Sequence, residues 1–519
     1  MTGGTAVVSI RETAQPLATV SRPSRTPCEP LAARVADVLS EAILAVTVFA
    51  VPLTLGGVLP GARFAFAAAG GILLVLAGAR PFLSAAARRE RPAVPAAFTW
   101  TLLALVALGF LQCLPLPGPV ASVFSGGIER LRGGLVADGA PGSGSLSLAP
   151  WKGGESLAFG LAFAGVLLAA AGTPSASGRR RRVALTLVSA GAFTALVGLA
   201  QRVAGRGDSV LFVFDAPPGA HPFGPYVNRN HFAGFVAVAL PMALGLAFSS
   251  WRRALDRMTG ATWTEILAET SRSTLGRAAF LLLVAALLLG SILLAGSRGG
   301  LLAAACGAAP LVFAATASRG SLSRGVGLVA TAAVLAAAAG LFLWVDPETL
   351  PSRFRDTASE SFRLPLWKDS AALFAESPLV GVGPGAFAVV FPSRQSFGAP
   401  FQFPFAESDI VCFAVERGAL GLALLLVLVL IAIVSVSKAL KEMPASRRYL
   451  LLGATGGALA LSVHAAYDFN GHLPGNGLIL AVALGLAFSW ARTAGNAGVP
   501  ARVDVVRVRT DNRPEKGSS

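Results

Sequence analysis

Residues 278–296 read AAFLLLVAALLLGSILLAG and contain no charged side chain. A helix of this length, at about 1.5 Å per residue, can cross most of the roughly 30 Å hydrocarbon core of a bilayer. Similar apolar runs recur along most of the 519 residues, of which 54% are hydrophobic and only 13% charged. An ordinary soluble domain carries about 25% charged residues. The sequence therefore excludes a soluble multidomain enzyme, a disordered chain and a disulfide scaffold, and predicts an all-α polytopic membrane protein.

Twelve segments are long and apolar enough to be predicted as membrane spans. The least distinct are the second, which is rich in Ala and Gly, and the pair on either side of Ser297-Arg298-Gly299. An error in either would change the side on which the chain ends. The predicted spans lie near residues 40–59, 62–79, 97–117, 155–172, 183–201, 231–249, 278–296, 299–317, 325–345, 409–437, 449–467 and 474–491.

The positive charges predict the orientation, because Lys and Arg accumulate in short cytoplasmic loops. With twelve spans, the side that holds both termini carries 29 of the 43 Lys and Arg residues, and the opposite loops carry 13. Both termini are therefore predicted to be cytoplasmic. This bias accounts for the net charge of +16 without a nucleic-acid partner. The first forty residues lack the apolar core of a removable signal peptide, so we expect the first span to be an uncleaved anchor.

These spans divide the chain into six predicted segments. They are a cytoplasmic N-terminal segment (1–39), N-terminal transmembrane helices (40–201), central transmembrane helices with arginine motifs (202–345), a long outer loop (346–408), C-terminal transmembrane helices (409–491) and a cytoplasmic tail (492–519). In the outer loop, residues 367–374 have the pattern of an amphipathic helix. The glycines of 381–385 lack the Gly-Lys-Ser/Thr of a P-loop and indicate a structural turn. The Phe-rich stretch 397–405 suits a lid on the membrane interface.

Scarce polar residues gather on the predicted outer side. Ionisable residues at membrane depth are costly and usually face a bundle interior or a wet cavity. Their placement predicts an anion-binding cleft that opens outward. The residues concerned are all four histidines (His221, His231, His464 and His472), together with Arg202, Arg229, Asn230, Arg298, Asp468 and Asn470.

Arg298 is the most informative of these residues. It stands in the tight turn Ser297-Arg298-Gly299-Gly300, where glycine permits close backbone approach. The guanidinium offers a rigid fork of donors that suits phosphate. The alternative is a hairpin arginine that extends to lipid phosphate.

Two carboxylates, Glu407 and Asp409, precede the tenth predicted span. At the membrane surface they could act as a base or bind a metal. Alternatively, they cap the helix, whose N-terminal dipole favours acids. For Glu416 and Arg417 we expect a structural role in the bundle. The four cysteines are far apart and show no CxxC spacing, so the sequence implies neither a disulfide framework nor a zinc site.

Five motifs occur in an order that resembles the O-antigen ligase and Wzy-type polymerase superfamily, over roughly residues 185–490. They are Asn228–Gly234, Ser297–Gly300, Gly381–Phe387, Glu416–Gly421 and Asp468–Pro474. The resemblance implies a GT-C-like, multipass enzyme of the bacterial inner membrane. Such an enzyme takes a glycan from undecaprenyl diphosphate at the periplasmic face and passes it to a hydroxyl of a lipid or glycan acceptor, without a metal or other cofactor.

The resemblance also implies roles for particular residues. In the ligases, arginines hold the diphosphate, and the similar positions here are Arg202 or Arg229 together with Arg298. Ligases carry a His followed by Asn, Ser or Gln, then nine residues and Gly-x-x-Gly. Here Ser408 and the two glycines match, but Glu407 stands in the place of the histidine. A carboxylate can act as a base if burial raises its pKa. The predicted catalytic residues are Glu407, Asp409 and His464, and the other motif residues are Asn230, His231, Asp468 and Asn470.

Several functions remain open at this point. A ligase and a polymerase of O-antigen or exopolysaccharide repeats cannot be separated, because the acceptor is not encoded in the motif residues. Because Glu407 replaces the histidine of the ligases, the catalytic base could instead be another residue, or the protein could be a scaffold without enzyme activity. An anion transporter could use the same arginine-lined cleft, but transporters often show inverted repeats, and this sequence shows no convincing internal repeat.

Overall fold

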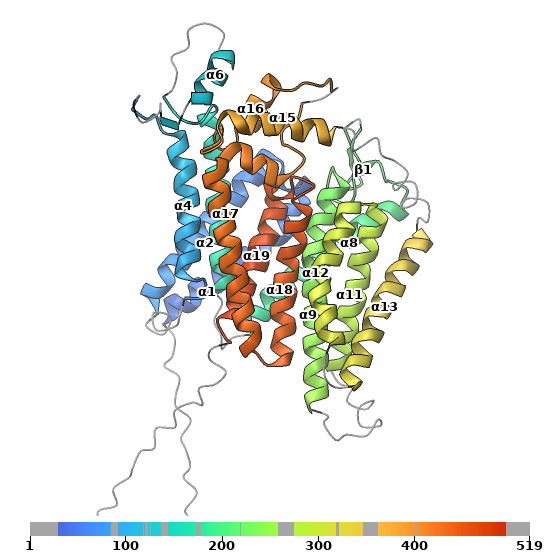
Figure 1. Cartoon of the computed structure of the whole chain (residues 1–519). Helices are drawn as coiled ribbons and strands as arrows, with labels where there is room; N and C mark the ends of the chain where they lie inside the picture. The colour runs from blue at the N-terminus through green and yellow to red at the C-terminus, as the bar shows by residue number, and fades with distance from the viewer. Residues whose placement is uncertain are drawn as a thin grey trace, which may run out of the picture.

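The computed structural model describes residues 30–84, 92–117, 119, 123–124, 126–135, 144–172, 178–217, 219–257, 274–317, 321–345, 362–399 and 402–494. Long helices dominate it, and the one sheet in this part of the chain is a hairpin of β1 (Ser209–Val210) and β2 (Phe214–Asp215). Figure 1 shows the long helices side by side in an upright bundle, with α15 lying across one end. The prediction of an all-α polytopic membrane protein is confirmed.

The helices follow the apolar segments closely. Their bounds are α1 (Leu31–Leu53), η1 (Leu55–Gly57), α2 (Pro60–Leu83), α4 (Ala96–Cys113), α6 (Gly126–Leu135), α7 (Pro150–Ala171), α8 (Arg179–Val203), α9 (Arg229–Arg257), α11 (Thr274–Ala295), α12 (Arg298–Thr316), α13 (Ser321–Val345), α15 (Arg363–Glu376), α16 (Phe387–Val390), η3 (Phe391–Ser393), α17 (Asp409–Glu442), α18 (Ala445–His464), η4 (Asn470–His472) and α19 (Pro474–Ala491).

Eleven of the described helices are long and apolar enough to cross a membrane. The two least distinct predictions are confirmed, since α2 covers the second span and α11 and α12 flank the turn at Ser297. α18 covers the predicted span at 449–467 but is not among the eleven, because Arg447 and Arg448 in its first turn lower its mean hydropathy. It nevertheless packs against α9, α12 and α19 within the bundle.

Small residues bring the central helices together. α9 is buried along its whole membrane-spanning length and packs against α8, α11, α12 and α18. A Cβ on Gly453 of α18 would stand 2.9 Å from the Pro241 carbonyl oxygen of α9, and one on Gly456 would collide with the Gly307 carbonyl of α12. Helices in membranes associate through such close backbone approach, because lipid supplies little hydrophobic driving force between them.

One end of the bundle collects the sequence motifs. α9, α12, α17 and α19 begin there, and α8, α11 and α18 end there. The amide of Asp409 at the start of α17 donates to the Ala465 carbonyl just after α18, at 2.9 Å. We call this the motif end; α15 marks it in Figure 1. At the opposite end, Arg179 and Asp37 form a salt bridge of 2.7 Å.

The outer segment before α17 folds into a small unit over the motif end. The predicted amphipathic helix at 367–374 is confirmed as α15. Gly381, Gly383 and Gly385 have φ of 72°, 103° and 72°, and the Gly383 amide donates to the Glu416 carbonyl at 3.0 Å. The glycine run is therefore a structural turn, as predicted. Phe403 is buried with Phe391 in the apolar core of this unit.

Parts of the segment predictions lie outside the described residues. These are residues 1–29 and 495–519 near the two ends and residues 346–361 and 400–401 of the outer loop. α1 begins at Leu31, earlier than the predicted span at 40. The segment boundaries and the lid role of 397–405 stay predictions.

Candidate active site at the motif end

Two histidines and a carboxylate form the buried centre of the motif end. His231 Nε2 in the first turn of α9 lies 3.2 Å from Asp468 Oδ1, and His464 Nε2 at the end of α18 lies 3.9 Å from Asp468 Oδ2. Both His464 and Asp468 are only 1% exposed. Burial opposes ionisation of Asp468, but His231, His464 and the Phe469 amide outweigh it and lower the pKa of Asp468. The centre therefore holds a buried negative charge that histidines stabilise.

An amide network ties this centre to α19. The side-chain amide of Asn476 donates to the His231 carbonyl at 2.9 Å and to Asn470 Oδ1 at 2.5 Å. The Tyr226 hydroxyl donates to Asn476 Oδ1 at 2.9 Å. Buried polar groups need such partners, so this network fixes α9 relative to α19. The sequence had indicated Asn470 but not Asn476 or Tyr226; the position of Asn476, close behind the motif 468–474, was the available signal.

Glycines of two motifs make room for these side chains. A Cβ on Gly234 would collide with Asn470 Oδ1, and one on Gly299 would stand 3.0 Å from His464 Nε2. These contacts explain why glycine occurs beside polar residues in both motifs, and they place α12 directly against the buried centre.

Glu407 stands beside this centre with an unusual backbone. Its φ of 51° lies in the left-handed region, which non-glycine residues seldom occupy. The side chain is half-buried, and no hydrogen bond or ion pair ties it to the described residues. Burial raises the pKa of Glu407 to about 7; the Asp468 charge adds to this effect, while Arg363 and His231 oppose it. Glu407 is thus a carboxyl group that changes protonation near neutral pH.

Asp409 holds the turn after α18 and does not cap its own helix. Its Oδ2 accepts from the Gly471 amide at 2.6 Å, and its Oδ1 lies 2.5 Å from His472 Nδ1. The capping side chain is that of Ser408, which accepts from the Val411 amide at 3.3 Å. Ser408 is therefore the N-cap residue, and Asp409 lies in the first turn of α17, where the helix dipole favours an acid.

The predicted diphosphate arginines lie at helix ends on the same side of the bundle. Arg298 is the first residue of α12, after the N-cap Ser297, and adjoins the glycine that contacts His464. Arg229 is the first residue of α9, and its amide donates to the His221 carbonyl at 2.7 Å. Arg202 lies in the last turn of α8. All three are half-buried. Arg229 therefore lies two residues before His231 of the buried centre, and Arg298 lies beside the glycine that approaches His464.

Asn230 and Arg363 are two further polar residues of the motif end. The Asn230 amide donates to the Asn228 side chain at 2.8 Å, which shapes the start of α9. Arg363 begins α15 and acts electrostatically on both Glu407 and His464. No sequence motif distinguishes Arg363 from the other arginines of the outer loop.

Residues 283–426 match the family model described as O-antigen ligase (Wzy_C). This segment of the chain is similar to the O-antigen ligase family. None of the curated proteins compared with this sequence matches it. The match confirms the resemblance to the O-antigen ligase and Wzy-type polymerase superfamily, and with the apolar helices it indicates a membrane protein of polysaccharide biosynthesis.

The matched segment, residues 283–426, supplies only part of the motif end. It contains Arg298, Arg363, Glu407 and Asp409, and the remaining buried centre is contributed by α9, α18 and the turn after α18. Three buried polar atoms at this junction lack a hydrogen-bond partner within the described chain. They are His464 Nδ1, Asp468 Oδ2 and Asn470 Nδ2. Unpartnered buried atoms are rare, so together they mark a place where water or a bound molecule would be stabilised.

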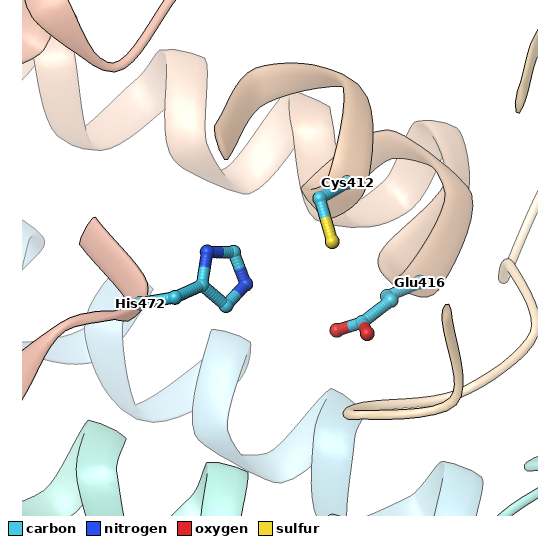
Figure 2. A group of neighbouring side chains, drawn as sticks. All are labelled: Cys412, Glu416 and His472. Carbon is cyan, nitrogen blue, oxygen red and sulfur yellow. The ribbon is translucent and has the colours of Figure 1, made fainter. Parts of the chain in front are cut away.

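A second group of side chains lies near the buried centre. Cys412 and Glu416 of α17 and His472 of η4 place one donor atom each within 4.8 Å of one another (Figure 2). The cysteine spacing had given no indication of a zinc site. The reason is that His472 comes from a distant part of the chain and reaches Cys412 only in the folded protein.

Proposed function

We propose that this protein is a glycosyltransferase that moves a glycan from undecaprenyl diphosphate to an acceptor hydroxyl at the periplasmic face of the inner membrane. The observation that carries the proposal is the position of Glu407, which is half-buried beside Asp468 within the segment that matches the O-antigen ligase family. Burial also raises the pKa of Glu407 to about 7, which suits a general base at neutral pH. The excess of Lys and Arg in the opposite loops supports a periplasmic motif end.

In the proposed reaction, the Glu407 carboxylate takes the proton of the acceptor hydroxyl. The hydroxyl oxygen attacks the anomeric carbon of the donor glycan, and the bond from that carbon to the diphosphate oxygen breaks. Asp468 raises the pKa of Glu407 and so strengthens it as a base. His231 and His464 are too buried to meet an acceptor directly, so we assign them the role of positioning Asp468.

The leaving undecaprenyl diphosphate gains negative charge as the bond breaks. Positively charged groups aimed at this charge would stabilise the transition state. We assign this role to Arg298, with Arg229 and Arg202 as further contacts. Arg298 also stands at the N-terminus of α12, where the helix dipole favours an anion. The arginines supply the positive charge that the proposed step needs, so this step involves no metal ion.

Purified protein in detergent tests the proposal. Incubated with a lipid-linked glycan donor and a glycan or lipid acceptor, it is expected to form a glycosidic bond and release undecaprenyl diphosphate. A transporter would form no bond in the absence of compartments, so intact donor after incubation with the matching acceptor would contradict the proposal.

The two enzyme classes differ in what a deletion strain accumulates. Lipid-linked polymer would assign the protein as a ligase, which is our first reading. Lipid-linked single repeats would assign it as a polymerase of O-antigen or exopolysaccharide. Normal surface glycan with no accumulated lipid intermediate would contradict both.

A further inference from the structure

Cys412, Glu416 and His472 form a compact group of metal-ligand types. Cys412 and Glu416 are four residues apart in α17 and therefore share one helix face. Cys412 is fully buried, Glu416 is 6% exposed, and the His472 side chain is 27% exposed. Figure 2 shows the three side chains pointing toward a common space between α17 and the turn before α19.

The orientation of His472 is that of a metal ligand. Its Nδ1 lies 2.5 Å from Asp409 Oδ1, and Asp409 is held in turn by the Gly471 amide at 2.6 Å. A carboxylate at Nδ1 accepts a hydrogen bond from that nitrogen and leaves Nε2 available as a ligand. Metal-bound histidines commonly donate their second ring nitrogen to a carboxylate in this way.

The surroundings of Glu416 also favour a role as a metal ligand. Its carboxylate accepts from the Phe387 amide at 3.2 Å, and it forms no salt bridge within the described part of the chain. Its neighbour Arg417 is directed elsewhere, to Gln112 Oε1 and Ser156 Oγ, each at 3.4 Å. Arg417 acts on Glu416 electrostatically but donates no hydrogen bond to it within the described chain, so a divalent ion would be a closer partner for this buried carboxylate.

We propose that Cys412, Glu416 and His472 bind a zinc-class divalent ion. A set of one sulfur, one nitrogen and one carboxylate oxygen suits zinc and not calcium or magnesium, which prefer oxygen alone. Zinc binding would displace the Cys412 thiol proton to solvent. In a tetrahedral site the ligand atoms lie about 3.5 Å apart, so the donors would need to contract modestly from their present separation. The fourth position would hold water.

The bound ion would join α17 to the turn that follows α18. That turn carries Asp468, and Asp409 already holds it from the other side. The metal would therefore stabilise the loop geometry next to the transfer site and take no part in the proposed proton transfer. This inference does not depend on the proposed function.

Metal binding to the full-length protein in detergent tests the proposal. After chelation, Zn²⁺ alone is expected to bind at one equivalent per chain, and Co²⁺ in its place is expected to give the near-ultraviolet band of a thiolate–cobalt bond. Cys412→Ser is expected to abolish the band. The matched controls Cys113→Ser and Cys306→Ser remove the other cysteines of the described chain and are expected to keep it.

Two further variants keep the proposal testable if Cys412→Ser does not fold. Asp409→Asn keeps the three ligands but loses the carboxylate behind His472, and we expect it to weaken zinc affinity by about 10- to 100-fold. Glu407→Gln is expected to retain one zinc per chain while it loses transfer, which separates the two proposals. Failure of the folded wild-type protein to bind Zn²⁺, or a cobalt band that survives in folded Cys412→Ser, would overturn the inference.

Discussion

At the level of single residues, the proposed function of the motif end depends on Glu407. It occupies a left-handed backbone position and a half-buried site beside Asp468, and both features cost stability. Proteins keep such strain where it serves a function, and a carboxyl group with a pKa of about 7 is well matched to base catalysis at neutral pH.

Replacing Glu407 with Gln is expected to lower the rate of glycan transfer by about 100- to 10,000-fold, the usual contribution of a general base. The amide keeps the size of the side chain but cannot accept the proton. Transfer is measured with purified protein, lipid-linked donor and acceptor. Glu442→Gln, which alters an exposed carboxylate at the other end of α17, serves as the control. Full activity of Glu407→Gln would place the base elsewhere.

The raised pKa of Glu407 also predicts a pH-dependent stability difference. The folded state binds this proton more tightly than the unfolded state, so the contribution of Glu407 to stability is complete below the unfolded value near 4.5 and is lost as pH rises through about 7. Glu407→Gln is therefore expected to raise the thermal midpoint relative to wild type at pH 8 more than at pH 4. An equal change at both values would contradict the assigned pKa.

Arg298→Ala is expected to reduce transfer by about 100- to 1,000-fold, because it removes the guanidinium proposed to stabilise the charge that develops on the diphosphate. The protein should still insert into the membrane, which is checked by its abundance in the membrane fraction. Arg324→Ala removes an exposed arginine of α13 near the opposite end of the bundle and should leave transfer unchanged. Unimpaired transfer by Arg298→Ala would exclude it as the diphosphate contact.

At the level of elements, glycine contacts set how closely the helices approach. Gly456 of α18 faces the Gly307 carbonyl of α12 so closely that an added methyl group has no room. Because α18 carries His464 and α12 carries Arg298, their spacing also fixes the distance between the buried centre and the proposed diphosphate contact.

Gly456→Ala is therefore expected to destabilise the protein by about 1–3 kcal/mol, the usual cost of overpacking, and to lower the thermal midpoint in detergent. Gly71→Ala in α2 is the matched control, since nothing lies within 4 Å of its added Cβ. It should be neutral or slightly stabilising, because alanine favours helix more than glycine does. Equal midpoints for the two variants would disprove the close contact.

At the level of the whole molecule, the orientation of the bundle determines which compartment the motif end faces. The salt bridges of Arg179 with Asp37 and Glu41 lie at the opposite end, among the loops that carry most of the positive charge. Reporter fusions after Ser396, next to α15, are expected to show a periplasmic location, and fusions after Met443, between α17 and α18, a cytoplasmic one. The reverse pattern would invalidate the proposed periplasmic reaction.

The sequence by itself determined the membrane spans and most, but not all, of the polar residues at the motif end. Transfer of an apolar segment into lipid depends on about 20 consecutive residues, so helices such as α11 are evident from local composition. Only the tertiary structure decided that His231 meets Asp468, that Glu407 is half-buried, and that His472 lies beside Cys412. These contacts join residues far apart in the chain, and they depend on how closely the helices pack, which no local pattern encodes.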